Sequence, residues 1–96
     1  MNLFKYSITI TYMQQHYKQN LIILGQRVKT LRENTGESIN SLVFKRGGLT
    51  SATWSRIENG LFDVKFNTLI KVASILGITL EELLKNLSFD YTIYEE

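Results

Sequence analysis

The sequence predicts a mainly α-helical domain of five helices, flanked by a short β-strand at each end of the chain. Apolar residues recur at steps of three and four between residues 20 and 87, which is typical of amphipathic helices. Residues 3–12 and 88–94 instead alternate apolar and polar side chains. We therefore expect a strand extension and linker at residues 1–19, a helical domain at residues 20–87, and a C-terminal strand tail at residues 88–96.

The two terminal segments have the two-residue period of a strand with one buried face. The apolar positions are Phe4, Tyr6, Ile8, Ile10 and Tyr12 in the first segment, and Phe89, Tyr91 and Ile93 in the second. A two-stranded ribbon alone is marginal in water. We therefore expect these strands to pair with each other against the helices, or with the strands of a second subunit.

Each expected helix has a residue that can start or stop it. Asn20, Ser38, Thr50 and Thr79 are expected N-caps of the first, second, third and fifth helices, and Gly36, Gly60 and Gly77 can end the first, third and fourth. The third helix is expected from Thr50 through Asn59, with Trp54 and Ile57 facing inward. The fourth is expected from about Phe66 to Leu76.

Composition narrows the class of protein. A chain of 96 residues suffices for one domain, and 44% hydrophobic with 21% charged residues is ordinary for a globular protein. The sequence has no cysteine, which excludes disulfides and thiolate metal sites. The longest apolar run, Leu21–Leu24, is too short to cross a bilayer, and the alternation at the N-terminus is not a signal-peptide pattern. The sequence leaves open whether Met1 or Met13 is the native start, and the alternation of residues 3–12 indicates that this segment folds in either case. We expect a cytoplasmic protein without metal or cofactor.

Two short helices joined by the tight turn Arg46-Gly47-Gly48-Leu49 form a helix-turn-helix arrangement. Three segments carry a more specific pattern: LGQRVKTLR at 24–32, LTSATWSRIENG at 49–60 and LIKVASILGITLEELL at 69–84. Through these segments, which together span residues 24–84 or about two-thirds of the chain, the sequence resembles the Cro/C1-type (XRE-like) helix-turn-helix family of transcriptional regulators. The resemblance implies a five-helix lambda-repressor-like domain that binds double-stranded DNA.

The charge distribution agrees with a polyanionic partner. Residues 20–65 hold seven basic side chains and four acidic ones, whereas residues 66–96 hold two basic and five acidic ones. The middle of the chain is therefore the part suited to nucleic acid.

The resemblance makes the helix at about residues 50–59 the recognition helix, lying in the major groove. The predicted DNA-binding residues are Ser38, Lys45, Arg46, Thr50, Ser51, Ala52, Ser55, Arg56 and Lys65. Arg56 is the candidate for direct readout, because its guanidinium can pair with guanine O6 and N7. Ala52 would suit a thymine methyl group.

Several of these residues also have a purely structural interpretation. Thr50 could serve only as an N-cap, Arg56 could be a solvated surface charge, and Lys45 with Arg46 could be a solvated helix end. Trp54 is expected in the core. The resemblance implies that Arg32 and Glu58 form an ion pair between the first and third helices, and His16 is expected at the surface.

The sequence departs from the family at four places. Ile39 replaces a glutamine that usually contacts phosphate, and Val43 replaces a small residue at the contact of the second and third helices. The turn contains an extra glycine, and the loop at residues 61–64 lacks the usual basic residues. Fewer phosphate contacts would give weaker non-specific binding and a shallower salt dependence.

These features predict a repressor-like transcriptional regulator that binds an operator as a homodimer. The alternative is a protein-interaction module of the same fold, such as an antitoxin whose partner is a toxin. An enzyme is not expected, because the acidic residues are scattered and the single histidine has no evident catalytic partner.

Overall fold

The computed structural model describes residues 3–92, with side chains described from residue 18 onward. It contains five α-helices in this part of the chain, and no strand: α1 (Leu3–Thr35), α2 (Ile39–Arg46), α3 (Ser51–Glu58), α4 (Phe66–Leu76) and α5 (Leu80–Leu84). The mainly α-helical prediction is confirmed. None of the described helices is long and apolar enough to span a membrane.

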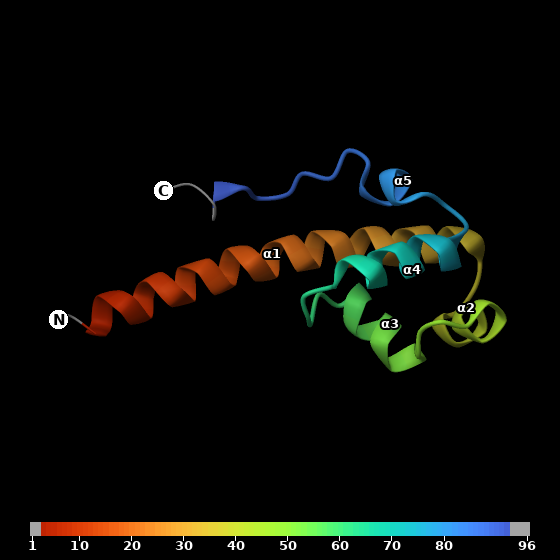
Figure 1. Cartoon of the computed structure of the whole chain (residues 1–96), viewed down its shortest axis with the longest axis horizontal. Helices are drawn as coiled ribbons and strands as arrows, with labels where there is room; N and C mark the ends of the chain where they lie inside the picture. Colours follow the sequence, from red (N-terminus) through yellow and green to blue (C-terminus); the bar gives the residue numbers. More distant parts are fainter. Residues whose placement is uncertain (1–2, 93–96) are drawn as a thin grey trace.

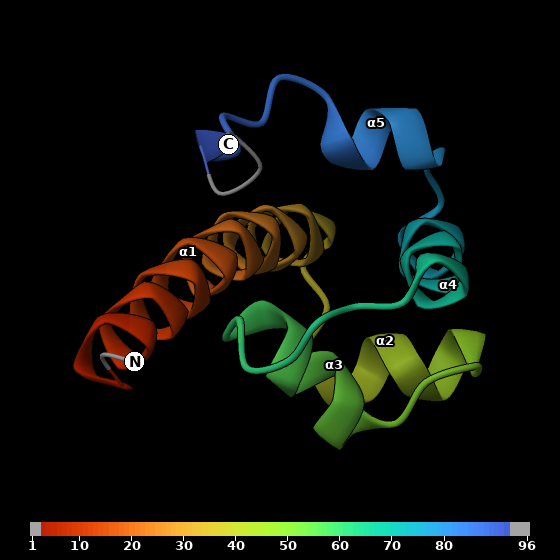
Figure 2. The same ribbon diagram turned by 60° about the vertical axis from the view of Figure 1, so that its left-hand side comes forward.

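Helix α1 is the longest element, and its N-terminal half projects beyond the other helices (Figure 1). The C-terminal half of α1 packs against α3, α4 and α5, while α2 packs against α3 and α4 (Figure 2). All five helices contribute side chains to one hydrophobic core or to its margin. The buried core residues are Leu24, Val28, Leu42, Val43, Trp54, Ile57, Val72, Ala73, Ile75 and Leu83.

The predicted strand at residues 3–12 is wrong, because these residues belong to α1. A single strand leaves its backbone groups without partners, whereas a helix pairs them within the segment. No glycine or proline lies before Gly25 to interrupt a helix. The helix therefore continues through residue 20, and Asn20 lies inside α1 rather than capping its start.

The expected C-terminal strand is also not formed by residues 88–92, and residues 93 and 94 lie outside the described part of the chain. The segment that follows α5 runs back beside α1 (Figure 1). Two contacts fasten it there. The side-chain amide of Asn20 binds the backbone of Asp90, and the Arg27 guanidinium donates to the Lys85 carbonyl at 2.6 Å. The C-terminal segment is thus held by side chains of α1 and not by pairing with a second strand.

The remaining helix boundaries follow the predicted caps. Ser38, Thr50 and Thr79 each accept a hydrogen bond from a backbone N–H in the first turn of α2, α3 and α5. Helix α1 ends at Thr35, directly before Gly36, and α4 ends at Gly77 in the left-handed conformation, which glycine adopts without a Cβ penalty. These caps fix where α2, α3 and α5 begin and where α1 and α4 end.

Candidate nucleic-acid interface

Helices α2 and α3 form a helix-turn-helix unit through residues 47–50. Gly47 ends α2, and its N–H donates to the Val43 carbonyl at 2.8 Å. Gly47 and Gly48 both have positive φ, of 69° and 91°, a conformation that other residues rarely adopt. Thr50 then starts α3 by accepting a hydrogen bond from the Thr53 N–H at 3.1 Å. Both glycines, including the one that is extra relative to the family, therefore allow the backbone conformation by which the chain passes from α2 to α3.

The inward face of α3 is held by a buried polar network. Trp54 is fully buried, and its indole N–H donates to Glu58 Oε2 at 2.6 Å. Arg32 on α1 makes a two-pronged ion pair with the same carboxylate, through Nε at 2.6 Å and Nη2 at 3.0 Å. Hydrogen bonding to Glu58 raises the pKa of Arg32 above its ordinary value, against the opposite effect of burial. The expected Arg32–Glu58 pair and the core position of Trp54 are both confirmed.

A close approach of backbones supports the same contact between α1 and α3. A Cβ on Gly25 would collide with the carbonyl oxygens of Ile57 and Glu58, the latter at 2.6 Å. At the end of α3, Gly60 has a φ of 66° and lies against the backbone of Ile22. These contacts leave α3 little freedom to move relative to α1.

The outward face of α3 carries the exposed residues of the predicted site. Thr50, Ala52 and Arg56 are exposed, whereas Ser51 and Ser55 are half-buried on the side that faces α2. Within the described part of the chain, no segment covers this outward face, as the position of α3 at the edge of the domain in Figure 2 indicates. A helix with one locked face and one open face is the geometry that major-groove docking requires.

Ser38, Ser51, Ala52 and Ser55 come together around a shallow hollow of about 500 Å³ between α2 and α3. Arg32, Ile39 and Asn40 complete its lining. Asn40 was missed by the sequence analysis, although it directly follows the helix start and carries an amide that can both donate and accept. The lining is therefore rich in hydroxyl and amide groups, and its one charged side chain, Arg32, is committed to Glu58.

Arg56 borders a different hollow, together with Thr53, Leu61 and Phe62. Thr53 was also missed by the sequence analysis; its hydroxyl receives a hydrogen bond from the Thr50 hydroxyl at 3.0 Å. The exposed surface of α3 thus has a neutral side towards α2, and a side towards the following loop where Arg56 is the charged residue.

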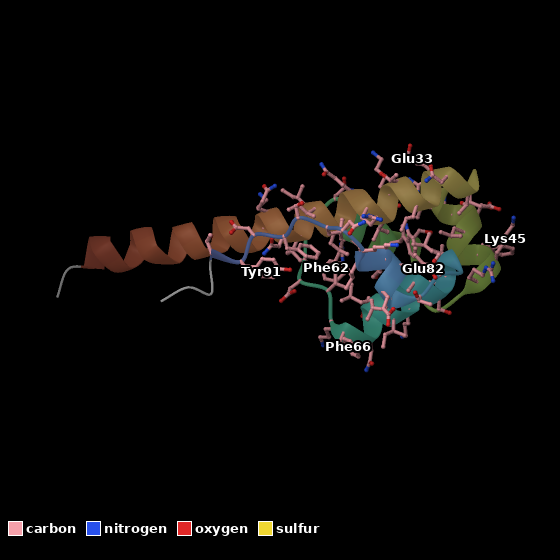
Figure 3. All side chains as sticks on the ribbon, turned by 90° about the horizontal axis from the view of Figure 1, so that it is seen from above. Glu33, Lys45, Phe62, Phe66, Glu82 and Tyr91 are labelled. Carbon is pink, nitrogen blue, oxygen red and sulfur yellow. The ribbon has the colours of Figure 1, made fainter. Side chains whose placement is uncertain are left out.

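Three predicted basic residues lie outside both hollows. Lys45, which lies near the end of α2 and is labelled in Figure 3, forms an ion pair with Glu37. Arg46 lines another hollow together with Lys71 of α4, a residue that the sequence analysis did not select. Lys65 precedes α4 as its N-cap residue, without a side-chain capping bond. Any DNA contacts made by these three residues would be to positions flanking the surface of α3.

Ile39 packs against the core and cannot act as the phosphate-contacting polar group found at this position in the family. No cluster of three or more His, Cys, Asp or Glu side chains that could hold a metal ion is found among the described residues.

The fold and site together define a helix-turn-helix domain. A sequence model of the Cro/C1-type HTH DNA-binding domain matches residues 25–86, more than half of the chain. The chain therefore belongs to this family of DNA-binding domains, as the resemblance in the segments at 24–32, 49–60 and 69–84 predicted. A search among curated proteins and a search among solved structures found no match.

Proposed function

We propose that this protein is a sequence-specific transcriptional regulator that inserts α3 into the major groove of DNA and represses by occupying a promoter. The observation that carries this proposal is the position of α3, whose inward face is fixed by Trp54 while Ala52 and Arg56 face outward, exposed. A rigidly held helix presents its side chains to base edges without an added entropic cost of ordering.

The proposed roles follow from the chemistry of each side chain. Arg56 reads a guanine through O6 and N7, and Ala52 contacts a thymine methyl group. Thr50 and Ser51, at the N-terminus of α3, contact phosphates or base edges. The hydroxyl and amide groups around Ser38 and Asn40 extend this contact along α2.

Selection of bound DNA from a random pool tests this function. The unmutated protein should enrich a defined sequence, and Arg56→Ala should lose the preference at one base pair, at a cost of about 1–3 kcal/mol in binding free energy. Lys85→Ala is the matched control, because Lys85 is an exposed cation at the end of α5, a helix that lies apart from α3 (Figure 2). It should leave the enriched sequence unchanged.

A uniform loss of affinity in Arg56→Ala, with every base preference retained, would make Arg56 a phosphate contact. Failure of the unmutated protein to enrich any sequence would contradict the proposed function itself.

We propose that the protein acts as a homodimer, with two α3 helices reaching half-sites about 34–36 Å apart. A single short recognition surface with few basic groups supports this requirement for a second subunit. Leu61, which is 65% exposed beside Arg56, is the proposed interface residue. Sedimentation should show a dimer bound to DNA, and Leu61→Ser should weaken this dimer. If the protein sediments only as a monomer at micromolar concentration, both with and without DNA, the proposed homodimer is contradicted.

One observation favours a second function, that of a protein-interaction module such as an antitoxin. Phe44 on α2 is 90% exposed, and a protein partner that covered this aromatic side chain would gain free energy from burying it. Absence of DNA enrichment together with a stoichiometric protein complex that Phe44→Ser disrupts would favour this function over DNA binding.

A further inference from the structure

A third hollow lies on a side of the domain that the proposed recognition surface does not use. It has a volume of about 440 Å³ and is lined by Arg46, Gly47, Gly48, Ile70, Lys71, Ser74 and Ile75. The lining comes from the end of α2, the turn after it, and α4, and it shares no residue with the hollow between α2 and α3. Figure 2 shows α4 beside the end of α2 at this edge.

The charge of this hollow is uncompensated. Arg46 and Lys71 are both exposed, and neither forms an ion pair with an acidic residue in the described part of the chain. The lining includes no acidic side chain. Lys45, the neighbour of Arg46, differs because it is paired with Glu37. Two cations brought to one hollow from separate helices repel each other, so binding of an anion between them is favourable.

The available groups fit one class of anion. A guanidinium matches the oxygens of a phosphate group in two-pronged geometry, and an ammonium acts as a point charge beside it. Ser74 lines the same hollow with a hydroxyl that can donate a further hydrogen bond. We propose that this hollow binds a phosphate group, held by Arg46 and Lys71.

Two sources can supply the phosphate. The turn that walls the hollow leads directly into Thr50 and α3, so DNA bound by α3 has a backbone phosphate close to this side. This source rests on the proposed function. A small phosphorylated molecule is the other source, and Ile70 and Ile75 would contact its apolar part.

The DNA source is tested by binding to the selected sequence over a range of salt concentrations. Arg46→Ala and Lys71→Ala should each reduce the slope of log affinity against log salt by about 0.9, the value for one released counterion. Lys85→Ala, with the same loss of one exposed charge, should keep the slope. Since all three side chains are exposed, the variants should match the native protein in thermal unfolding, which checks that they fold.

The free source is tested by titrating inorganic phosphate and following the amide NMR signals of Gly47 and Gly48, with chloride at equal ionic strength as control. A saturating shift that Lys71→Ala abolishes supports a site for small phosphorylated molecules. A reduced salt slope without this shift supports a DNA phosphate, and both together support one site open to either.

An unchanged salt slope in both variants, together with no saturating shift, would overturn the proposed site. If the native protein binds no DNA, the proposed function fails, but the phosphate titration still decides whether the site exists.

Discussion

The side chain of Asn20 forms two hydrogen bonds with the backbone of Asp90, 70 residues further along the chain. Its Oδ1 accepts from the Asp90 N–H at 2.6 Å, and its Nδ2 donates to the Asp90 carbonyl at 2.8 Å. One side-chain amide thus satisfies both backbone groups of a residue in an irregular segment. The contact attaches the C-terminal segment to the middle of α1.

Asn20→Ala should release this attachment. We expect a loss of about 1–3 kcal/mol in the free energy of unfolding, from two hydrogen bonds of ordinary strength, and faster amide hydrogen exchange at Asp90. Asn34→Ala is the matched control, because Asn34 is exposed on the same helix and gains the same helix propensity. Equal stabilities of the two variants would contradict the attachment.

Arg32→Ala should destabilise the domain by about 3 kcal/mol, because it leaves the Glu58 carboxylate buried without its cation. The side chain of Glu58 is 4% exposed and that of Arg32 is 13% exposed. Denaturant unfolding measures the loss, and a double-mutant cycle with Glu58→Ala should show strong coupling. The exposed pair of Lys45 and Glu37 provides the comparison, since Lys45→Ala should cost less. Additive single losses would contradict this prediction.

Trp54→Phe tests the third member of the same network. The change removes the indole N–H that donates to Glu58 and leaves a gap in the core, so we expect a loss of about 2–4 kcal/mol. Circular dichroism is the suitable measurement, because Trp54 is the only tryptophan of the sequence and its fluorescence is lost with it. A variant as stable as the native protein would show that the indole bond is dispensable.

Gly25→Ala should separate α1 from α3. The added methyl group would overlap the carbonyl oxygens of Ile57 and Glu58, and overpacking of this kind costs about 1–3 kcal/mol, which the better helix propensity of alanine does not offset. Gln26→Ala, at the exposed neighbouring position, is expected to leave thermal stability nearly unchanged. A Gly25→Ala protein that melts at or above the native temperature would contradict the close approach.

The stability contributed by Glu37 should depend on pH. Hydrogen bonds from Lys45 and Ser41 hold the pKa of Glu37 below its ordinary value of 4.5, so its contribution is complete above that pH. As the pH falls through the lowered pKa of the folded state, the contribution is lost. The difference in free energy of unfolding between the native protein and Glu37→Gln should therefore be constant near neutral pH and shrink below 4.5. A difference that persists unchanged down to about pH 2, two units below the ordinary range, would contradict it.

The parts of the fold that the sequence predicts are those with local signals. Ser38, Thr50 and Thr79 are caps whose effect is confined to one helical turn, and the segment LTSATWSRIENG at 49–60 places Trp54, Glu58 and Gly60 in one short stretch. The pairing of Arg32 with Glu58 came from the resemblance, since nothing local relates two charges 26 positions apart.

The terminal segments were mispredicted because their alternation is a real strand signal that lacks a partner. A strand needs a second strand, and residues 88–92 instead use Asn20 and the core around Phe89. The crossing of α2, α3 and α4 decides which residues line each hollow. It brings Arg46 and Lys71 to one hollow, and it places Asn40 and Thr53 beside the predicted site residues. The angle at which helices cross depends on tertiary packing, and the periodicity of apolar residues in the sequence does not indicate it.

Two residues that fix the rotation of α3 about its own axis are Trp54, buried in the core, and Glu58, paired with Arg32 of α1; both lie on the side opposite Ala52 and Arg56. The two sets of positions are therefore free to vary independently. New side chains can be exchanged at the outward positions to alter what the helix contacts, while the scaffold beneath them keeps its orientation.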